Sequence, residues 1–309
     1  MSPRGRAIVW QAAALGAAGA LVGLAALEAA SNLKARGIAS GFAYLGRAAG
    51  FEIAPGPLPY SARDTYARAL AVGLVNTLRV SLAGIVLATV MGVMLGLARL
   101  SKVRALSLPA AGYLEVVRNT PLLLQLLVWY SLWQGLPGPR AALHPLPGVL
   151  LCNRGLFLPS LSERPALSGF DIRGGLSLSP EFGALLLCLA TYTAAFLGEI
   201  VRGGVLSVGR GQTEAAAALG LSRARTLRLV VLPQALRVMV PPATSQFLNL
   251  AKNASLGVAI GYPELIAVTG STLNQTGQAI EAIALATLVY LAVSLSFSLA
   301  VHLWRRGRW

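Results

Sequence analysis

Three neighbouring polar residues, Lys252, Asn253 and Ser255, are the side chains in this sequence best placed to bind a polar solute. They lie well inside an otherwise apolar run, 237–262, and unpaired polar groups at membrane depth usually mark the path of a solute or an ion. The run also contains two adjacent prolines. It therefore indicates a broken helix, whose open backbone groups would add donors and acceptors to such a path.

A second interpretation assigns the same residues to packing. Asn253 and Ser255 then only bond neighbouring helices, and Lys252 pairs with a carboxylate such as Glu199. Both interpretations satisfy the requirement that polar groups in a membrane find partners.

Asn119 and Thr120 are further candidates for the path, because they open another apolar segment that starts near Tyr113. Pro121 follows them and removes a backbone donor, so that the carbonyl it leaves free must be satisfied by a neighbour or by water. The charged residues at the start of this segment, Glu115 and Arg118, would cost little there if they neutralise each other or reach the interface.

No pattern typical of catalysis occurs in the sequence. The two cysteines, Cys152 and Cys188, are far apart, and the two histidines are isolated. The sequence also lacks a Walker A motif, a GxSxG nucleophile motif and any cluster with metal-ligand spacing. We therefore expect no catalytic residue, no metal site and no cofactor on this chain.

Composition predicts a membrane protein built as one polytopic domain. Of 309 residues, 55% are hydrophobic and only 12% are charged, which suits several membrane spans. The net charge of +15 arises from short basic clusters between apolar runs, without any motif that binds nucleic acid. The positive-inside rule explains these clusters better than nucleic-acid binding does.

The predicted topology has six spans with both termini in the cytoplasm. The first span, 8–27, is read as uncleaved, although a cleavable signal peptide is the alternative. Basic residues after the second span mark its cytoplasmic end. Residues 66–79 are predicted to be an amphipathic lead-in at the interface, and residues from Tyr262 to about Gly277 are predicted to be external. The remaining spans are predicted at 80–98, from Tyr113 onward, 183–201, 237–262 and 281–303.

The segment 209–233 is rich in arginine and alanine and predicts a helix-turn-helix outside the membrane. Gly220 can end the first helix in a left-handed conformation, and Ser222 can cap the second. Ala215, Ala218 and Leu219 would share one face and form a ridge of small residues for a partner's groove. The alternative is an arginine-rich loop that serves only as a topology signal.

The spacing within this segment resembles the EAA loop of permease subunits in binding-protein-dependent ABC importers. Glu214-Ala215-Ala216 is followed by Gly220 and then by Val230, Leu232 and Pro233, with Val230 the one departure, from the usual isoleucine. In that family the loop is the coupling helix that docks on a cytoplasmic ATPase. The resemblance assigns ATPase coupling to Glu214, Ala215, Ala216, Gly220, Leu232 and Pro233.

Two further strings resemble a subgroup of that family. EVVRNTPLLLQL is similar to the polar amino-acid permeases, and CNRGLFLP resembles the insertion of the longer broad-range L-amino-acid and glutamate/glutamine/aspartate permeases. The insertion is rich in Pro and Gly and is predicted to be external. A disordered loop is the alternative, but Leu156, Phe157 and Leu158 indicate that part of it packs.

The resemblance implies an all-α membrane fold, with a five-helix importer core plus one N-terminal helix. It divides the chain into residues 1–65, an N-terminal helix and external loop, and residues 66–309, the transport domain, with an external insertion at 136–181 and a cytoplasmic coupling loop at 202–236. It places the chain among membrane lipid in the bacterial cytoplasmic membrane.

The implied function is uptake of polar L-amino acids driven by ATP. The implied partners are ABC ATPase subunits that hold ATP and Mg²⁺, a second permease subunit that makes a heterodimer, and an external amino-acid-binding protein. A secondary amino-acid transporter is the alternative, but it would need carboxylates in mid-span, and these are scarce here. A membrane enzyme is disfavoured by the missing catalytic motifs.

Overall fold

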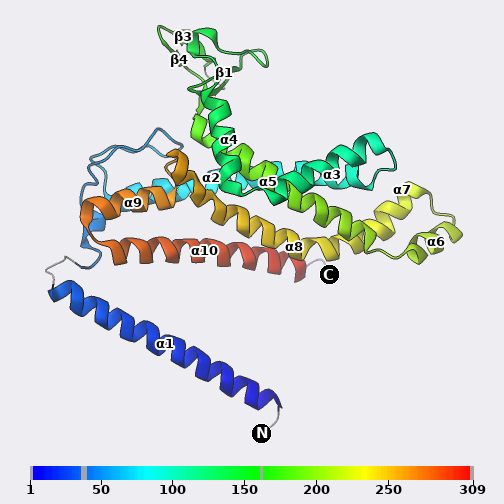
Figure 1. The fold of residues 1–309 in the computed structure, drawn as a ribbon, viewed down its shortest axis with the longest axis horizontal. Coiled ribbons are helices and arrows are strands. Elements are labelled where there is room, and N and C mark those ends of the chain that lie inside the picture. Colours follow the sequence, from blue (N-terminus) through cyan, green and yellow to red (C-terminus); the bar gives the residue numbers. More distant parts are fainter. Residues whose placement is uncertain (1–2, 36–39, 161–162, 307–309) are drawn as a thin grey trace.

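The computed structural model describes residues 3–35, 40–160 and 163–306 and is mainly helical (Figure 1). Its long helices are α1 (Pro3–Ala35), α2 (Tyr66–Leu100), α3 (Arg104–Asn119), α4 (Leu122–Gln134), α5 (Pro180–Leu206), α8 (Leu232–Asn253), α9 (Leu265–Thr276) and α10 (Ala279–Arg306). Shorter ones are η1 (Ala43–Gly46), η2 (Pro139–Ala141), α6 (Arg210–Ala218), α7 (Arg223–Thr226), the π-helix η3 (Leu227–Val231) and the 3₁₀-helix η4 (Ala254–Ile260).

Within the described residues, four helices are long and apolar enough to cross a membrane: α1, α2, α5 and α10. A fifth crossing is formed if the helical stretch 223–260 and α9, bent by 52°, count as one broken span. The predicted number of six is therefore not confirmed. α1 differs from the others because its apolar window is fully exposed, and Figure 1 shows it apart from the remaining helices.

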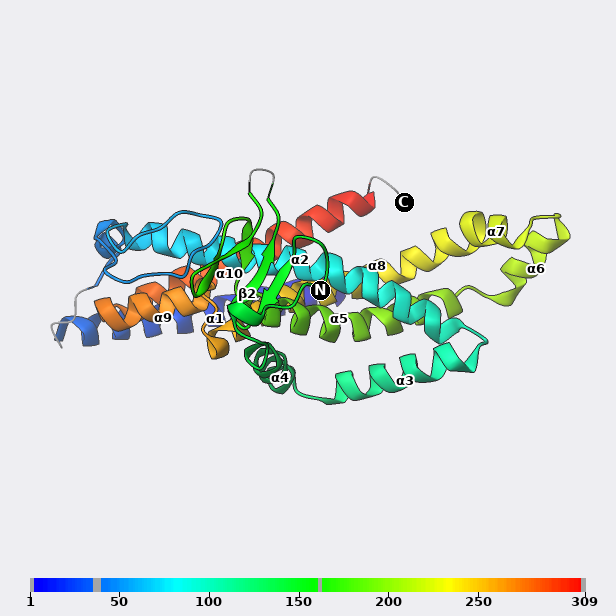
Figure 2. The same ribbon diagram turned by 90° about the horizontal axis from the view of Figure 1, so that it is seen from above.

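The segment that starts near Tyr113 is not one span, contrary to the prediction. It forms α3 and α4, which meet at Pro121, and α4 is seen almost end-on in Figure 2 while α3 lies across the view. In a continuous helix the carbonyl of Val117 would accept from the residue at position 121, where proline has no N–H. Gln125 Nε2 replaces that donor at 2.8 Å and also donates to the Thr120 carbonyl at 3.0 Å. This confirms the prediction that the freed carbonyl needs a partner.

α2 runs without interruption for 35 residues, so the predicted lead-in is continuous with the span, and its place at the interface stays a prediction. The first half of α2 packs within the protein. Asn76 is 3% exposed and donates to the Pro263 carbonyl at 2.9 Å, and the Arg79 guanidinium lies 4.3 Å from the centre of the Phe182 ring.

α2 and α5 form the centre of the bundle because small residues let their backbones approach closely. A methyl group added at Gly92 would lie 2.5 Å from Leu197 Cβ, and one added at Gly96 would lie 2.6 Å from Val201 Cβ. Buried side chains of α2, α4, α5, α8 and η4 surround this contact, among them Val80, Leu126, Leu185, Leu189 and Leu250.

The predicted broken helix at 237–262 is present: the α-helix changes to the 3₁₀-helix η4 after Asn253, and the 52° bend follows between Ile260 and Leu265. Pro241 and Pro242 lie inside α8 without ending it, since proline more often bends a helix than terminates it. η4 follows and ends at Gly261, which has φ +78°. Residues after Tyr262 form α9, which packs on α2. The membrane side of this segment stays a prediction.

The insertion is a folded module of short strands, so the disordered alternative is wrong for its described residues. β1 (Leu150–Cys152), β2 (Gly155–Leu158) and β5 (Leu176–Leu178) form one antiparallel sheet, and β3 (Ala166–Ser168) and β4 (Asp171–Arg173) form a second. Phe157 is 7% exposed and lies in the module's own core. This confirms the prediction that part of the insertion packs.

Candidate functional site

A cavity of about 500 Å³ with charged walls lies where α2, α3 and α5 meet. It contains two arginines and two glutamates, together with an amide and an aromatic ring. Helical spacing produces this set, because residues three apart share one face of α3 and residues on the last turns of α5 face it. The lining residues are Arg99, Ala111, Leu114, Glu115, Arg118, Asn119, Phe196 and Glu199.

The charges of this cavity are only partly paired. Glu199 accepts from Arg202 Nε at 3.0 Å, and its other oxygen lies 4.0 Å from Arg99. Arg99 Nε is buried and has no acceptor among the described residues. Arg118 lies 5.3 Å from the centre of the Phe196 ring, which holds its guanidinium against the cavity wall. The cavity therefore offers both signs of charge to a small polar ligand.

The structure separates the predicted path residues. Asn119 lines the charged cavity, whereas the Thr120 hydroxyl donates to the Val116 carbonyl at 2.8 Å. Lys252 lies elsewhere, beside a closed space of about 10 Å³ between α2, α8, α9 and α10. Ser255 Oγ donates to the Lys252 carbonyl at 2.8 Å.

The alternative pairing of Lys252 with Glu199 is not formed. Glu199 has Arg202 and Arg99 as its partners, and within the described parts of the chain no ion pair includes Lys252. Asn253 is half-buried at the end of α8. The packing interpretation expected Ser255 to bond a neighbouring helix, whereas its bond is local, and it does not account for Lys252.

Sequence reasoning missed Arg99, Phe196 and Glu199 as members of one site. Arg99 was explained as a topology signal, and Glu199 as a partner for Lys252. A usable signal was the scarcity of acidic residues: only 11 occur in the chain, and Glu115 and Glu199 both fall in apolar segments. Carboxylates in such positions are functional candidates by default.

The predicted helix-turn-helix is confirmed at its turn. Gly220 has φ +76°, its N–H donates to the Ala217 carbonyl, and the Leu221 N–H donates to the Ala216 carbonyl. These two bonds form a Schellman motif, which ends α6. Ser222 Oγ accepts from the Arg225 N–H at 3.4 Å and caps α7, as predicted.

The small residues of α6 divide into a buried one and an exposed set. Ala216 is 3% exposed, whereas Glu214, Ala215 and Ala218 are exposed and Leu219 is 83% exposed. The exposed set agrees with the predicted ridge on one face of the helix. Ala216 instead packs inward. Leu232 and Pro233 begin α8 after the π-helix η3, which the sequence did not predict.

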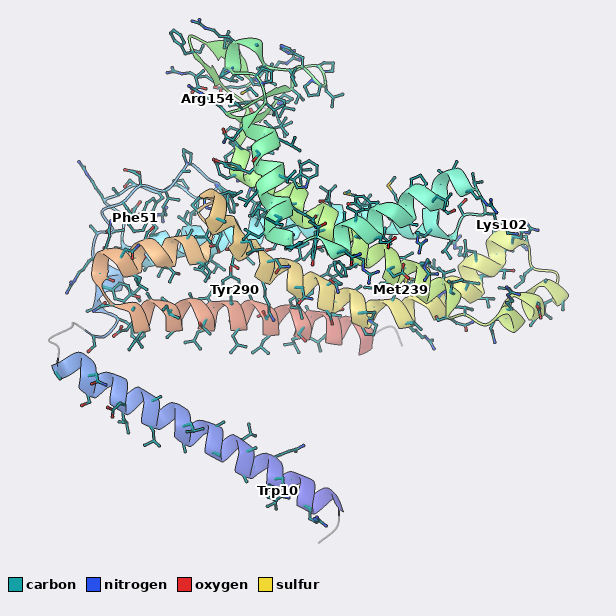
Figure 3. All side chains as sticks on the ribbon, viewed as in Figure 1. Trp10, Phe51, Lys102, Arg154, Met239 and Tyr290 are labelled. Carbon is teal, nitrogen blue, oxygen red and sulfur yellow. The ribbon has the colours of Figure 1, made fainter. Side chains whose placement is uncertain are left out.

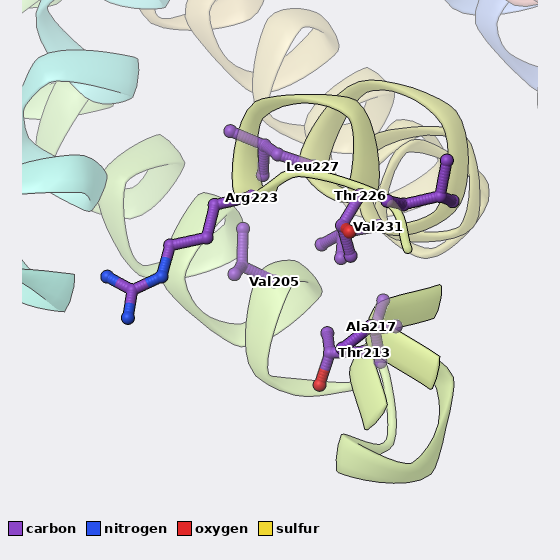
Figure 4. A pocket seen from close by; sticks show the side chains of 9 residues that line it. Val205, Thr213, Ala217, Arg223, Thr226, Leu227 and Val231 are labelled. Atoms are coloured by element: carbon purple, nitrogen blue, oxygen red, sulfur yellow. The ribbon is translucent and has the colours of Figure 1, made fainter. Parts of the chain in front are cut away.

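A second cavity, of about 480 Å³, separates α6 from the helices behind it. Figure 4 shows Thr213 and Ala217 of α6 on one side, Thr226 and Val231 on the other, and the Arg223 guanidinium pointing away. Its walls are mostly apolar, and α6 therefore touches the rest of the protein over a small area. The lining residues are Val205, Val208, Thr213, Ala217, Leu221, Arg223, Thr226, Leu227 and Val231.

Comparison with known proteins agrees with this architecture. A family described as the inner membrane component of binding-protein-dependent transport systems matches residues 84–307. The chain belongs to this family. It is also 41% identical to a putative amino-acid ABC transporter permease protein, YhdX, of Escherichia coli, over 99% of this chain and 94% of that one. The general L-amino acid transport system permease protein AapQ of Rhizobium johnstonii is 37% identical, over 97% and 91%.

Solved structures share the fold of this transport component. A crystal structure of an amino acid ABC transporter with histidines aligns with a TM-score of 0.59 and 26% identity, over 78% of this chain and 95% of that one. The all-α importer fold expected from the resemblance is therefore confirmed, and the chain is a permease subunit of an inner-membrane ABC importer rather than a secondary transporter. The β-strands of the insertion are an addition to that all-α plan.

Proposed function

We propose that this permease subunit translocates polar L-amino acids and that the charged cavity between α2, α3 and α5 holds the solute. A zwitterion needs donors for its carboxylate and acceptors for its ammonium group within one small space. Arg99 and Arg118 supply donors for the carboxylate, and Glu115 and Glu199 supply acceptors for the ammonium group. The occurrence of both charge signs in one cavity is the observation that supports the proposal.

Lys252, Asn253 and Ser255 contribute a second stretch of the path in this proposal. The α-helical pattern of α8 breaks to a 3₁₀-helix after Asn253, and Lys252 has no ion pair within the described residues. Polar groups of this kind at a helix break suit a passing solute better than a binding site. Asn119 lines the charged cavity, and Thr120, the next residue along the chain, completes the path.

In the same proposal, α6 and its neighbours couple transport to ATP hydrolysis. Glu214, Ala215 and Gly220 are exposed at the tip of the helix-turn-helix, where a partner ATPase can reach them. Ala216 packs inward behind that tip, and Leu232 and Pro233 begin α8 beyond η3. ATP and Mg²⁺ are bound by the ATPase subunits, and this chain carries out no chemistry.

The remaining partners and the topology complete the proposal. A second permease subunit forms a heterodimer with this one, and an external binding protein delivers the amino acid. The coupling loop 202–236 and both termini face the cytoplasm, whereas the insertion 136–181 faces outward. Residues 1–65 form an added N-terminal unit, and residues 66–309 form the transport domain.

The solute site is tested by uptake into proteoliposomes that contain the whole complex. Arg118→Gln and Asn119→Ala should each lower uptake by about tenfold, because one charge-assisted hydrogen bond to the solute is lost. Arg104→Gln changes an exposed arginine at the opposite end of α3, away from the cavity, and serves as the matched control. Amino-acid analogues without an α-carboxylate should no longer compete with the solute.

The outcome distinguishes a solute site from a structural charge cluster. If Arg118→Gln and Asn119→Ala leave both uptake and competition unchanged in assembled complexes, the cavity does not hold the solute. If they lower uptake equally for every analogue, the charges act on assembly or conformational change and not on the bound zwitterion.

A further inference from the structure

The insertion is joined rigidly to the transport helices. Trp133, near the end of α4, donates from Nε1 to the Cys152 carbonyl at 3.2 Å. The same indole lies against Gly183, where an added methyl group would come within 2.2 Å of the ring. β5 leads directly into α5, whose first turn is capped by Ser179. Because of these contacts, the module and the start of α5 must move together.

One aromatic residue of the module is exposed without a role in its core. Phe170 lies in the two-residue turn between β3 and β4 and is 73% exposed. The module's core consists of other side chains, such as Phe157 and Ile172. The Arg140 guanidinium lies 4.0 Å from the centre of the Phe170 ring, which holds the ring in place. Preorganised aromatic and arginine side chains are the types that dominate binding energy at protein interfaces.

The module is also positively charged. Residues 136–179 contain four arginines and two carboxylates, so their net charge is +2. Arg154 and Asp171 neutralise each other at 3.1 Å. The remaining arginines include Arg140, at the base of the exposed ring. Phe170 and Arg140 together form the tip of the module. A partner surface that fits this tip therefore has an apolar hollow surrounded by acidic side chains.

The position of the tip selects the partner. Figure 1 shows β3 and β4 standing clear of the helices, at the opposite end of α5 from α6. Figure 3 likewise places Arg154 of the module and Lys102 of the α2–α3 turn at separate ends of the molecule. If α6 faces the cytoplasmic ATPase, the tip faces outward, where a component of a binding-protein-dependent system meets its binding protein.

We propose that Phe170 and Arg140 form a contact point for the external binding protein, which presents an acidic surface with an apolar hollow. This inference rests on the orientation in the proposed function. Docking at the tip is transmitted through the Trp133 and Gly183 contact to α5, and α5 extends to Glu199 in the charged cavity. Delivery of the solute is thereby linked to the cavity that receives it.

The test is a titration of the intact complex in proteoliposomes with solute-loaded binding protein, read as ATPase activity. Phe170→Ala and Arg140→Glu should each raise the binding-protein concentration for half-maximal stimulation by about tenfold, with basal ATPase activity unchanged. Phe42→Ala and Arg63→Glu are matched controls, because both residues are exposed and belong to the loop region before α2. They should leave the titration unchanged.

A folding control is available in the module itself. Cys152 is fully buried there, so it should stay unreactive to thiol reagents in both tip variants. If Phe170→Ala exposes Cys152, Leu167→Ala provides a second variant for comparison. It changes an exposed residue of β3 outside the turn. A shift in half-maximal concentration with Cys152 still protected supports docking at the tip.

Three results would overturn the inference. The first is an unchanged titration in both tip variants. The second is loss of the second permease subunit from the purified complex, which would make the tip a contact between permeases. The third is an effect that appears only with anionic lipid and without binding protein, which would make it a membrane contact. A wild-type complex that the binding protein does not stimulate contradicts the proposed function instead.

Discussion

The two ends of α5 differ in how much open space surrounds them. At the end next to the insertion, the ring of Trp133 fills the space above Gly183. At the other end, a methyl group added at Gly204 would lie 2.2 Å from Met239 Cγ, but one added at Gly203 would meet no atom within 4 Å, and a cavity of about 480 Å³ lies between α5, α6 and η3. The coupling end is therefore held on the face towards α8 and open on the face towards α6.

This difference fits the two tasks that a transport subunit must combine. A rigid connection passes a movement on without loss, whereas a loosely packed element can occupy two positions of similar energy. The π-helix η3 borders the same cavity, and π-helices are rare and often occur at functional sites. The following predictions test whether the contrast between the ends is functional.

The largest effect is expected at the coupling end, from Gly220→Val. Valine at φ +76° costs about 1–2 kcal/mol and disrupts the motif that ends α6. Uptake by the reconstituted complex should be abolished, while the subunit still inserts and the binding protein still binds solute. Gly203→Val, at an open helical position of α5, should retain uptake. Normal transport by Gly220→Val would remove the coupling role from α6.

Ala216→Asp should abolish uptake for a different reason. Ala216 is 3% exposed, so an aspartate there buries a carboxylate without a partner and detaches α6 from the helices behind it. The measurement is uptake together with co-purification of the ATPase subunit. Ala224→Asp changes an exposed alanine of α7 outside the predicted ridge and is the control for the added charge itself.

A smaller effect is expected at the insertion end, from Gly183→Ala. The added methyl group would lie 2.2 Å from the Trp133 ring, and overpacking of this kind costs about 1–3 kcal/mol. The thermal midpoint of the purified subunit should fall by several degrees. Gly203→Ala has open space and should leave it unchanged or raise it. Equal midpoints would mean that the two ends of α5 are packed alike.

Filling the cavity behind α6 should have a moderate effect on function and little on stability. Ala217→Leu places a larger side chain in that space and restricts the movement of α6, so solute-stimulated ATPase activity should fall by about threefold. Ala217→Ser adds a single heavy atom and is the matched control. Unchanged activity in the leucine variant would show that α6 does not move into the cavity.

The smallest effect is expected at the junction of α8 and η4. Asn253→Ala and Ser255→Ala remove polar groups from the proposed path, and the apparent affinity for competing amino acids should change by about threefold. Ser255 Oγ already bonds the Lys252 carbonyl, which limits its contribution. Unchanged affinity and selectivity in both variants, with normal assembly, would remove this stretch from the path.

Local features of the fold were predictable from the sequence. Gly220 and Ser222 specify the turn between α6 and α7, because a left-handed residue and an N-cap act within one helical turn. The apolar runs of α2, α5 and α10 are likewise evident from composition alone. The missing donor at Pro121 was visible, but the division of the segment into α3 and α4 was not.

The candidate solute site was decided by the tertiary structure. Arg99 and Glu199 come from α2 and α5, and they meet only because glycines let those helices pack closely. An arginine next to a span has the same sequence signature whether it orients the chain or lines a cavity.

The sequence by itself determined the class of this protein, a polytopic membrane subunit with a helical coupling segment, because apolar periodicity and turn chemistry are local properties. The tertiary structure decided which charges share a cavity, that the insertion folds into two small sheets, and that its exposed Phe170 stands apart from the core. Those outcomes depend on contacts between residues distant in the chain, whose energies cannot be read from any single segment.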